Sequence, residues 1–372
     1  MSLTDRFRMI PKYTVTSCVR VLAETEDYNH KLMNIPEAWK DTRGGGIKIA
    51  VLDTGCPKHI DISPAGHASM IDGYEFDGAG HSTHCAGAIA AIADNGIGVR
   101  GIAPDVEDHY VAVLDGEGTG SVDNIIRGIR YAVDVIGADI ITMSLGIDAT
   151  ASRIPELEAA CNYAVTHGTA VFAAAGNEAG RVGQPAQYDS VIAVAAVNSA
   201  KEHANFSNTG PEVDFACGGV DIYSTYLNNT YAKLSGSSMS TPALAAVGVL
   251  LLAKHKLAGE KLTPAELKEH IQRIAFDVGP GGYDEIFGWG IPVFGHNNTG
   301  LITPTPPAPT APKETKKFLP TADCMYWKMW NKFIDEVAKG KADGDPVKAL
   351  VSGLDALISE TAKVNAIITK KL

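Results

Sequence analysis

The 372-residue sequence has no apolar run that we interpret as a membrane span, and its N-terminus has no apolar stretch of the kind found in secretory signals. The first eleven residues mix charged side chains with isolated apolar ones. We therefore expect a cytoplasmic protein without a membrane partner. No internal repeat is visible in the sequence.

Positive charge is scarce relative to negative charge: 32 Lys and Arg stand against 43 Asp and Glu, which gives a formal net charge of −11 at pH 7. This balance argues against nucleic acids and anionic membrane surfaces as partners. The six cysteines lack the spacing of a disulfide framework, so we expect reduced thiols. One or two surface disulfides are the alternative.

Glycine is abundant, with 38 residues, and strand-like apolar runs alternate with helical patterns between residues 46 and 295. The expected strands are 47–52, 107–114, 140–143, 170–175 and 191–197, and the expected helices are 81–92, 122–136, 154–167 and 238–255. This alternation predicts an α/β fold with a doubly wound, mostly parallel sheet flanked by helices. Ligands bind beyond the carboxyl ends of such strands, where Asp53, Ser144 and Asn177 fall.

Composition divides the chain into four parts: an N-terminal segment (1–21), the α/β domain (22–298), a Pro-rich linker (299–317) and a small helical hairpin (318–372). The linker contains four Pro within residues 304–309. The apolar stripes of the hairpin predict two helices that pack on each other or on the main domain. A docking or oligomerisation module is the alternative.

Three motifs follow each other in the order Asp, His, Ser: IAVLDTG at 49–55, GHSTHCAG at 80–87 and GSSMSTP at 236–242. Acyl transfer needs a nucleophile, a base that takes its proton and a carboxylate that orients the base. We assign these catalytic roles to Ser238, His81 and Asp53. Each motif alone also fits a plain turn or helix cap, so the interpretation depends on all three together.

These motifs resemble those of the subtilisin-type serine peptidases, the subtilases, and the resemblance covers residues of about 20 to 297. Supporting runs are GVRGIAP at 98–104, MSLG at 143–146 and AAAGNE at 173–178. The resemblance implies the α/β fold predicted above and a serine endopeptidase that acts on proteins or peptides with broad specificity. A binding or assembly component with this fold and little proteolytic role is the alternative.

The resemblance also implies roles for residues around the triad. Asn177 would supply the side-chain donor of the oxyanion hole, together with the backbone N–H of Ser238; without the family match it would be an ordinary turn residue. The substrate would bind as an added strand. The segments implied to hold it are Gly118, Thr119 and Gly120, then Ser144, Leu145 and Gly146, and finally Gly176.

Within the family the chain is most similar to the intracellular subtilisins, through DTGC at 53–56, IRYAVD at 129–134, STYL at 224–227 and IPKY at 10–13. In that branch the N-terminal segment lies across the active site and keeps the enzyme inactive until it is cleaved. Ile10 and Pro11 are then the inhibitory residues, because a Pro has a fixed φ and no N–H. A disordered tail is the alternative. Relatives in that branch are often dimers, so a homodimer stays open.

A calcium ion is the cofactor that the resemblance implies. The loop at 93–99 would contribute the Asn95 side chain and the carbonyls of Ile97 and Val99, with Asp61 as the charged ligand. Oxygen ligands from a Gly-bearing loop suit Ca²⁺, although a plain turn explains the same residues.

Several residues depart from the family pattern: Ser82, Ile147, Cys217 and Ala243. Ile147 could narrow the substrate cleft, and the segment 178–184 is short for the first specificity pocket. Next to the catalytic His, His84 is expected to be a packed, hydrogen-bonded residue, since no third metal ligand accompanies it. Cys85 is expected to be a buried core residue, with a redox-sensitive or heavy-metal-sensitive thiol as the alternative.

Overall fold

The computed structural model describes residues 3–10, 15–19 and 23–297. The chain divides into two units, Met1–Leu301 and Ile302–Leu372, and the second lies outside the described residues. The predicted linker, the predicted helical hairpin and Pro11 therefore lie outside them too.

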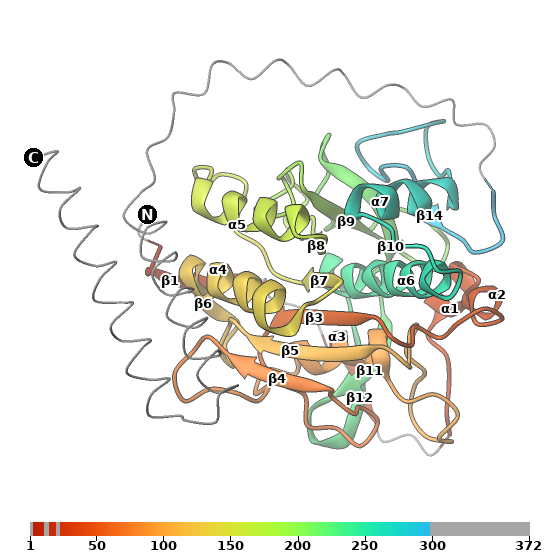
Figure 1. The fold of residues 1–372 in the computed structure, drawn as a ribbon, viewed down its shortest axis with the longest axis horizontal. Helices are drawn as coiled ribbons and strands as arrows, with labels where there is room; N and C mark the ends of the chain where they lie inside the picture. The colour runs from red at the N-terminus through yellow and green to blue at the C-terminus, as the bar shows by residue number, and fades with distance from the viewer. Residues whose placement is uncertain (1–2, 11–14, 20–22, 298–372) are drawn as a thin grey trace, which may run out of the picture. The chain divides into compact units, whose positions relative to one another are not determined.

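The centre of the described part is a sheet of seven strands in the order β10-β9-β8-β7-β3-β5-β4, and every neighbouring pair is parallel (Figure 1). In chain order the strands are β3 (Lys48–Asp53), β4 (Gly66–Ser69), β5 (Glu107–Ala112), β7 (Ile140–Met143), β8 (Ala170–Ala174), β9 (Val191–Val197) and β10 (Val213–Gly218). The inner strands are buried along nearly their whole length, as expected for a parallel sheet covered on both faces. The predicted doubly wound α/β fold is confirmed.

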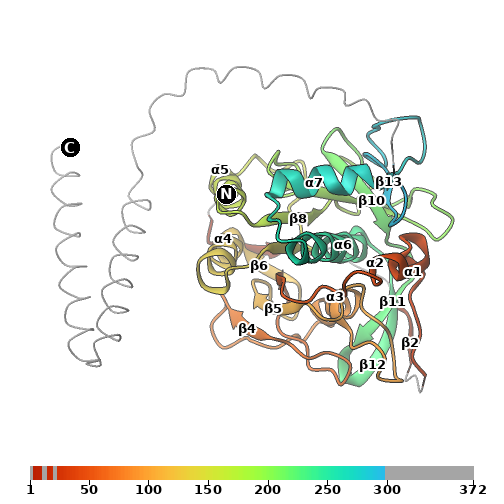
Figure 2. The same cartoon turned by 45° about the vertical axis from the view of Figure 1, so that its right-hand side comes forward.

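The sheet is flanked by helices. They are α1 (Tyr28–Leu32), α2 (Ile35–Ala38), α3 (His81–Ala90), α4 (Val122–Tyr131), α5 (Pro155–Thr166), α6 (Ser237–Leu257) and α7 (Pro264–Arg273), and α4 continues as a π-helical turn, η1 (Ala132–Ile136). Helix α4 packs against α5, whereas α6 lies between α3 and α7 (Figure 2). The predicted helices thus exist: the starts at residues 81 and 122 are as predicted, and the other ends shift by one to five residues.

Helix α6 is long and apolar enough to span a membrane by length and composition, which the sequence pattern did not suggest to us. Most of it is buried in the fold, against the sheet and the neighbouring helices. The core of this α/β domain therefore accounts for its apolar character.

Three small antiparallel sheets were not predicted. Strands β11 (Ile222–Tyr226) and β12 (Thr230–Leu234) form a hairpin, and β2 (Val15–Val19) pairs with β12. A second sheet joins β1 (Arg6–Arg8) to β6 (Thr119–Ser121). The third pairs β13 (Ala275–Phe276) with β14 (Ile291–Pro292). The first two sheets both include strands from the N-terminal segment. Strand β2 pairs with β12, which leads directly into the first turn of α6.

Candidate active site

Asp53 and His81 meet where β3 ends and α3 begins. The imidazole Nδ1 lies 2.8 Å from Oδ1 and 3.0 Å from Oδ2 of the carboxylate, and both side chains are buried. A carboxylate at this distance holds the ring in one orientation and keeps the proton on Nδ1, which leaves Nε2 as the basic nitrogen. The structure thus brings together two of the three predicted catalytic residues.

Ser238 is the second residue of α6 and is also buried. Its hydroxyl donates a 3.1 Å hydrogen bond to the carbonyl oxygen of Ser144, and the Ser144 hydroxyl donates back to the carbonyl of Ser238 at 2.8 Å. Ser144 directly follows β7, so this reciprocal pair fixes the first turn of α6 against the carboxyl end of the sheet. For the Ser238 hydroxyl to give its proton to another group, this bond to Ser144 would have to break.

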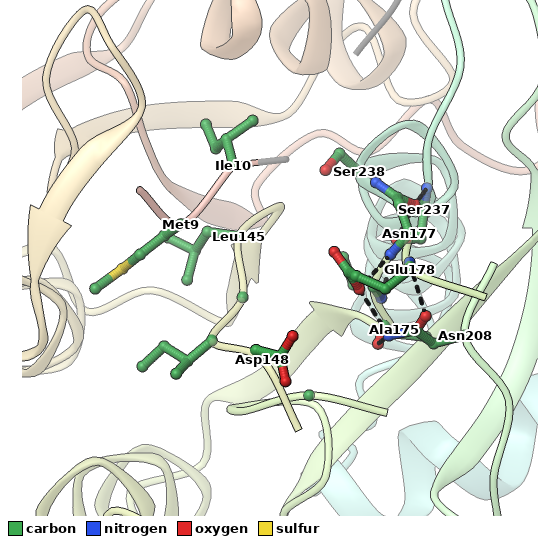
Figure 3. A pocket seen from close by; sticks show the side chains of 15 residues that line it. Met9, Ile10, Leu145, Asp148, Ala175, Asn177, Glu178, Asn208, Ser237 and Ser238 are labelled. Atoms are coloured by element: carbon green, nitrogen blue, oxygen red, sulfur yellow. Dashed lines mark hydrogen bonds between the residues drawn. The ribbon is translucent and has the colours of Figure 1, made fainter. Parts of the chain in front are cut away.

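Asn177 lies beside the same turn, as Figure 3 shows. Its Oδ1 accepts hydrogen bonds from the backbone N–H of Ser237 at 2.7 Å and from the Ser237 hydroxyl at 2.9 Å. A backbone N–H can only donate, so the amide orientation is fixed by these bonds rather than chosen freely. The Nδ2 group of Asn177 can therefore serve as a hydrogen-bond donor to a ligand. Ser237 is a positioning residue that the sequence analysis did not single out.

A second buried carboxylate, Asp77, supports the start of α3. It accepts hydrogen bonds from the backbone N–H groups of Ala79, Gly80 and Thr83 at 2.7–2.9 Å, and from the hydroxyls of Thr54 and Thr83 at 2.8 and 2.7 Å. Burial raises the pKa of Asp77, and these donors oppose that rise. The sequence signal was an Asp four residues before His81, which on its own also fits an ordinary turn.

Glycine is required at the position before His81. Gly80 has a φ of +82°, and an added Cβ would lie 2.5 Å from the ring of Tyr226. Because Gly80 has no side chain to cap the helix, Asp77 satisfies the N–H groups that a capping residue would otherwise bind. The start of α3, and with it His81, is thus fixed from two sides.

The predicted substrate segments contact the N-terminal part of the chain itself. Strand β1 pairs with β6 so that Arg8 faces Thr119 and Phe7 faces Gly120. The Met9 N–H then donates to the Gly118 carbonyl at 2.9 Å, and the Gly146 N–H donates to the Met9 carbonyl at 3.0 Å. Residues 6–9 therefore bridge the two segments that the sequence analysis assigned to substrate.

The hydrogen-bond pattern of the N-terminal segment changes at Met9. In a regular strand the N–H and C=O of one residue point to the same neighbouring strand. Those of Met9 bond to opposite sides, Gly118 and Gly146. Met9 and Ile10 are buried, with 1% and 2% of their surface exposed. The segment therefore leaves regular strand geometry while it is still inside the cleft.

A cavity opens beside these residues, between Leu145 and Asn177 (Figure 3). Its walls come from the segments after β7 and β8 and from the first turn of α6. Its lining residues are Met9, Ile10, Leu145–Asp148, Ala174–Glu178, Gly183, Asn208, Ser237 and Ser238. Ile147 is a wall residue, paired with Gln184 through two backbone hydrogen bonds of 2.7 and 2.9 Å. The cavity thus opens directly beside Asn177 and Ser238.

Two of the predicted metal ligands, Asp61 and Asn95, lie in contact, and the backbone N–H groups of Ile97 and Val99 bond to them. The buried Asp61 carboxylate accepts hydrogen bonds from Asn95 Nδ2 at 2.6 Å, from the Val99 N–H at 3.1 Å and from the Tyr231 hydroxyl at 3.2 Å. The Ile97 N–H donates to Asn95 Oδ1 at 2.9 Å. At Gly98 an added Cβ would lie 2.3 Å from Asp61 Oδ2, so a side chain there would fill the space in front of the carboxylate.

Glu24 adds a further oxygen donor to this loop. Its Oε1 accepts the Asn95 N–H at 3.2 Å, and its Oε2 accepts from Arg100 Nε at 2.6 Å. Two carboxylates and an amide suit a hard cation such as Ca²⁺. Asn95 directs its Nδ2 group at Asp61, so an ion between them would require the amide to turn its Oδ1 inward and to release the Ile97 N–H.

The two further residues near His81 belong to the core. His84 Nε2 lies 2.9 Å from the Ile222 carbonyl and 3.2 Å from the Ala232 carbonyl, so it links α3 to the β11–β12 hairpin. Burial raises the pKa of the Cys85 thiol, so the thiol stays protonated although it lies near Asp53 and His81. Cys56, Cys85, Cys161 and Cys217 are free and buried.

Comparison with known proteins matches the part of the chain that contains Asp53, His81 and Ser238. The family model described as the subtilase family matches residues 44–290. Subtilisin DY of Bacillus licheniformis is 39% identical over 249 residues, which cover 65% of this chain and 88% of the relative. Thermitase of Thermoactinomyces vulgaris is 39% identical over 244 residues, 63% of this chain and 85% of the relative. The minor extracellular protease Epr of Bacillus subtilis is 40% identical over 272 residues, 72% of this chain and 41% of the relative. The chain belongs to the subtilase family and is a serine-type endopeptidase.

Proposed function

We propose that the chain is made as an inactive precursor of a broad-specificity endopeptidase, with Asp53, His81 and Ser238 as its triad. One observation carries the proposal: the segment around Met9 occupies the cleft that leads to Ser238, and it does so through backbone hydrogen bonds. This is how an extended substrate would bind.

In the proposed reaction the Ser238 hydroxyl turns toward His81 and attacks a peptide carbonyl. The proton passes to Nε2 of His81, while Asp53 stabilises the imidazolium through Nδ1–H. The oxyanion accepts hydrogen bonds from Asn177 Nδ2 and from the Ser238 N–H, which lies at a helix N-terminus where N–H groups have no partner within the helix. His81 then protonates the departing amine, and water releases the acyl group by the reverse sequence.

Inhibition in this proposal is steric. Residues 6–9 fill the strand positions of a substrate, and Ile10 is packed against Gly118. On the far side Val15 pairs with Leu234, four residues before Ser238. Ile10 and Pro11 are proposed as the inhibitory residues, because a Pro has a fixed φ and no N–H. Removal of the segment would open the cleft.

Broad specificity is proposed because backbone atoms of Gly118 and Gly146 hold Met9 through its own backbone N–H and carbonyl, and such bonds do not distinguish side chains. A calcium ion is proposed at Asp61, Asn95 and Glu24, with the carbonyls of Ile97 and Val99. When bound, it would neutralise the Asp61 carboxylate and hold the loop at 93–99 to the body of the domain. A cytoplasmic location is also proposed, and the free buried thiols fit a reducing compartment.

The test compares the full chain with a form that starts near Leu22, by the rate at which a fluorophosphonate probe labels the protein. We expect slow labelling of the full chain, fast labelling of the shortened form and none after Ser238→Ala. Equal labelling rates for the two forms would remove the inhibitory role. Absence of labelling in both, with intact folding by circular dichroism, would favour the binding or assembly component.

A further inference from the structure

An ion pair joins the N-terminal segment to the rim of the cleft. Arg6 Nη2 lies 2.5 Å from Asp115 Oδ2 and 3.4 Å from the Thr119 carbonyl. Arg6 belongs to β1 and faces Ser121 in the pairing with β6. Its side chain therefore occupies a side-chain position of the bound strand, three residues before Met9.

Asp115 is held in the loop by hydrogen bonds that do not involve Arg6. Its Oδ1 accepts the N–H groups of Glu117 and Thr119 at 2.9 and 3.0 Å. Its own N–H and carbonyl close the loop through bonds of 2.9 Å to the Thr119 carbonyl and from the Gly118 N–H. These bonds leave Oδ2 for the guanidinium. Because the loop already fixes the carboxylate, binding of a basic side chain loses little conformational entropy at Asp115.

We propose that Asp115 is a specificity-determining residue of the cleft: it forms a subsite for a basic side chain of the substrate, and Arg6 is the internal occupant of that subsite. The inference rests on the proposed function, since it treats residues 6–9 as a substitute for substrate. It predicts a preference for substrates with Arg or Lys three residues before the one that takes the place of Met9. The same contact strengthens the closed, inactive form.

The exposure of the two side chains determines how much the Arg6–Asp115 ion pair can contribute to binding. Half of the Arg6 side chain and about a quarter of the Asp115 side chain are exposed, 50% and 24% respectively. Exposed ion pairs of this kind change an equilibrium by about two- to fivefold, and salt weakens them. An effect of this size modulates selection but does not determine it alone, which is compatible with broad specificity.

The first experiment follows docking without catalysis. In the full chain with Ser238→Ala, hydrogen exchange of the amides of residues 6–9 reports how often the segment leaves the cleft. We expect Arg6→Gln and Asp115→Asn each to speed exchange about two- to fivefold, and the double variant to speed it no further. Asn at 115 keeps an oxygen for the loop N–H groups, so the loop itself stays formed. Glu117→Gln, which removes a charge from the same loop, is the matched control and should change nothing.

Raising the salt concentration to 0.5 M NaCl should reduce these differences, because salt screens exposed ion pairs. Multiplicative effects of the two single variants, or no effect of either, would overturn the inference. The hydrogen-exchange results could be as expected while a fluorophosphonate fails to label the processed wild-type chain. In that case the proposed function would be wrong, but the binding of a basic side chain by Asp115 would stand.

The second experiment tests selection with the processed wild-type enzyme. Two eight-residue peptides with the sequence of residues 3–10, one with Arg6 and one with Gln in its place, compete with a short chromogenic substrate. The Arg peptide should inhibit about two- to fivefold more strongly, and Asp115→Asn should abolish that difference. Equal inhibition by the two peptides on the wild-type enzyme would contradict selection by Asp115.

Discussion

The Thr54 hydroxyl donates a 2.8 Å hydrogen bond to Asp77, and its oxygen also lies 3.1 Å from Oδ1 of Asp53. Thr54 therefore links the buried carboxylate that caps α3 to the carboxylate that orients His81. Asp53 follows the sheet and His81 opens the helix, so a displacement of either element would change the distance between them. The Asp77–Thr54 contact fixes that distance from outside the Asp53–His81 pair.

We predict that Asp77→Asn lowers kcat by roughly 10- to 100-fold with a much smaller change in KM. The Asn Nδ2 would face the donors of Thr83 or of Thr54 and Gly80, and hydrogen bonds to a charged acceptor are worth about 1.5–3 kcal/mol. Asp139→Asn is the matched control, because Asp139 also accepts a backbone N–H, that of Lys48, but at the opposite end of β3. Equal losses of kcat in the two variants would show that Asp77 acts on folding alone.

Asn177→Ala should lower kcat by about 10²–10³ and change KM little, the loss measured for an oxyanion donor in subtilisin, a member of this family. The reason is that the Asn177 amide, held by Ser237 through Oδ1, presents Nδ2 to charge that develops only during the reaction. Steady-state kinetics on one peptide substrate checks this. Asn198→Ala, in a turn after β9, should leave both constants unchanged, and a rise in KM alone for Asn177→Ala would place the amide in ground-state binding.

The sequence was sufficient for five of the seven strands of the sheet and for the residues at their carboxyl ends, whereas the edge strands β4 and β10 were not predicted. Buried parallel strands give long apolar runs, so β7 and β9 were predicted with their observed ends. Asp53 and Ser144 were located because each directly follows such a run. The motifs also named Ser238, although periodicity alone would have assigned this residue only to the start of a buried helix.

Short strands and contacts distant in sequence could not be predicted in this way. Strand β6 has three residues, and it exists because β1 pairs with it across more than a hundred positions. The β11–β12 hairpin mixes polar and apolar residues, and one of its edges is covered by β2. Asp77 and Ser237 acquire their roles only through partners from other elements, so no local pattern distinguishes them from turn residues.

Removal of metal should destabilise the protein if the proposed calcium site is real. In the Ser238→Ala background, which prevents autolysis, a chelator should lower Tm by on the order of 5–10 °C, since an ion at a hundredfold excess over its Kd adds about 2.7 kcal/mol. Asp61→Asn should have a lower Tm that no longer responds to calcium or chelator. An unchanged response in Asp61→Asn would place the ion elsewhere.

The buried carboxyl of Asp108 should make stability depend on pH in an unusual direction. Burial raises its pKa to about 6, against the hydrogen bond of 2.6 Å from the Tyr110 hydroxyl. The folded state therefore holds this proton more tightly than the unfolded state between about pH 4 and pH 6. Over that range the free energy of unfolding falls as the pH rises, because the unfolded chain releases the proton first.

Asp108→Asn removes this titration, so the free energy of unfolding should fall less between pH 4 and pH 7 in the variant than in the parent, by about 3 kcal/mol at most. Urea unfolding in the Ser238→Ala background measures the difference at each pH. Burial raises the pKa of Asp27 to about 6 as well, and both proteins retain that group, so its contribution cancels. Parallel stability curves would mean that the Asp108 carboxyl titrates alike in the folded and unfolded chains, which would require water to reach it in the folded state.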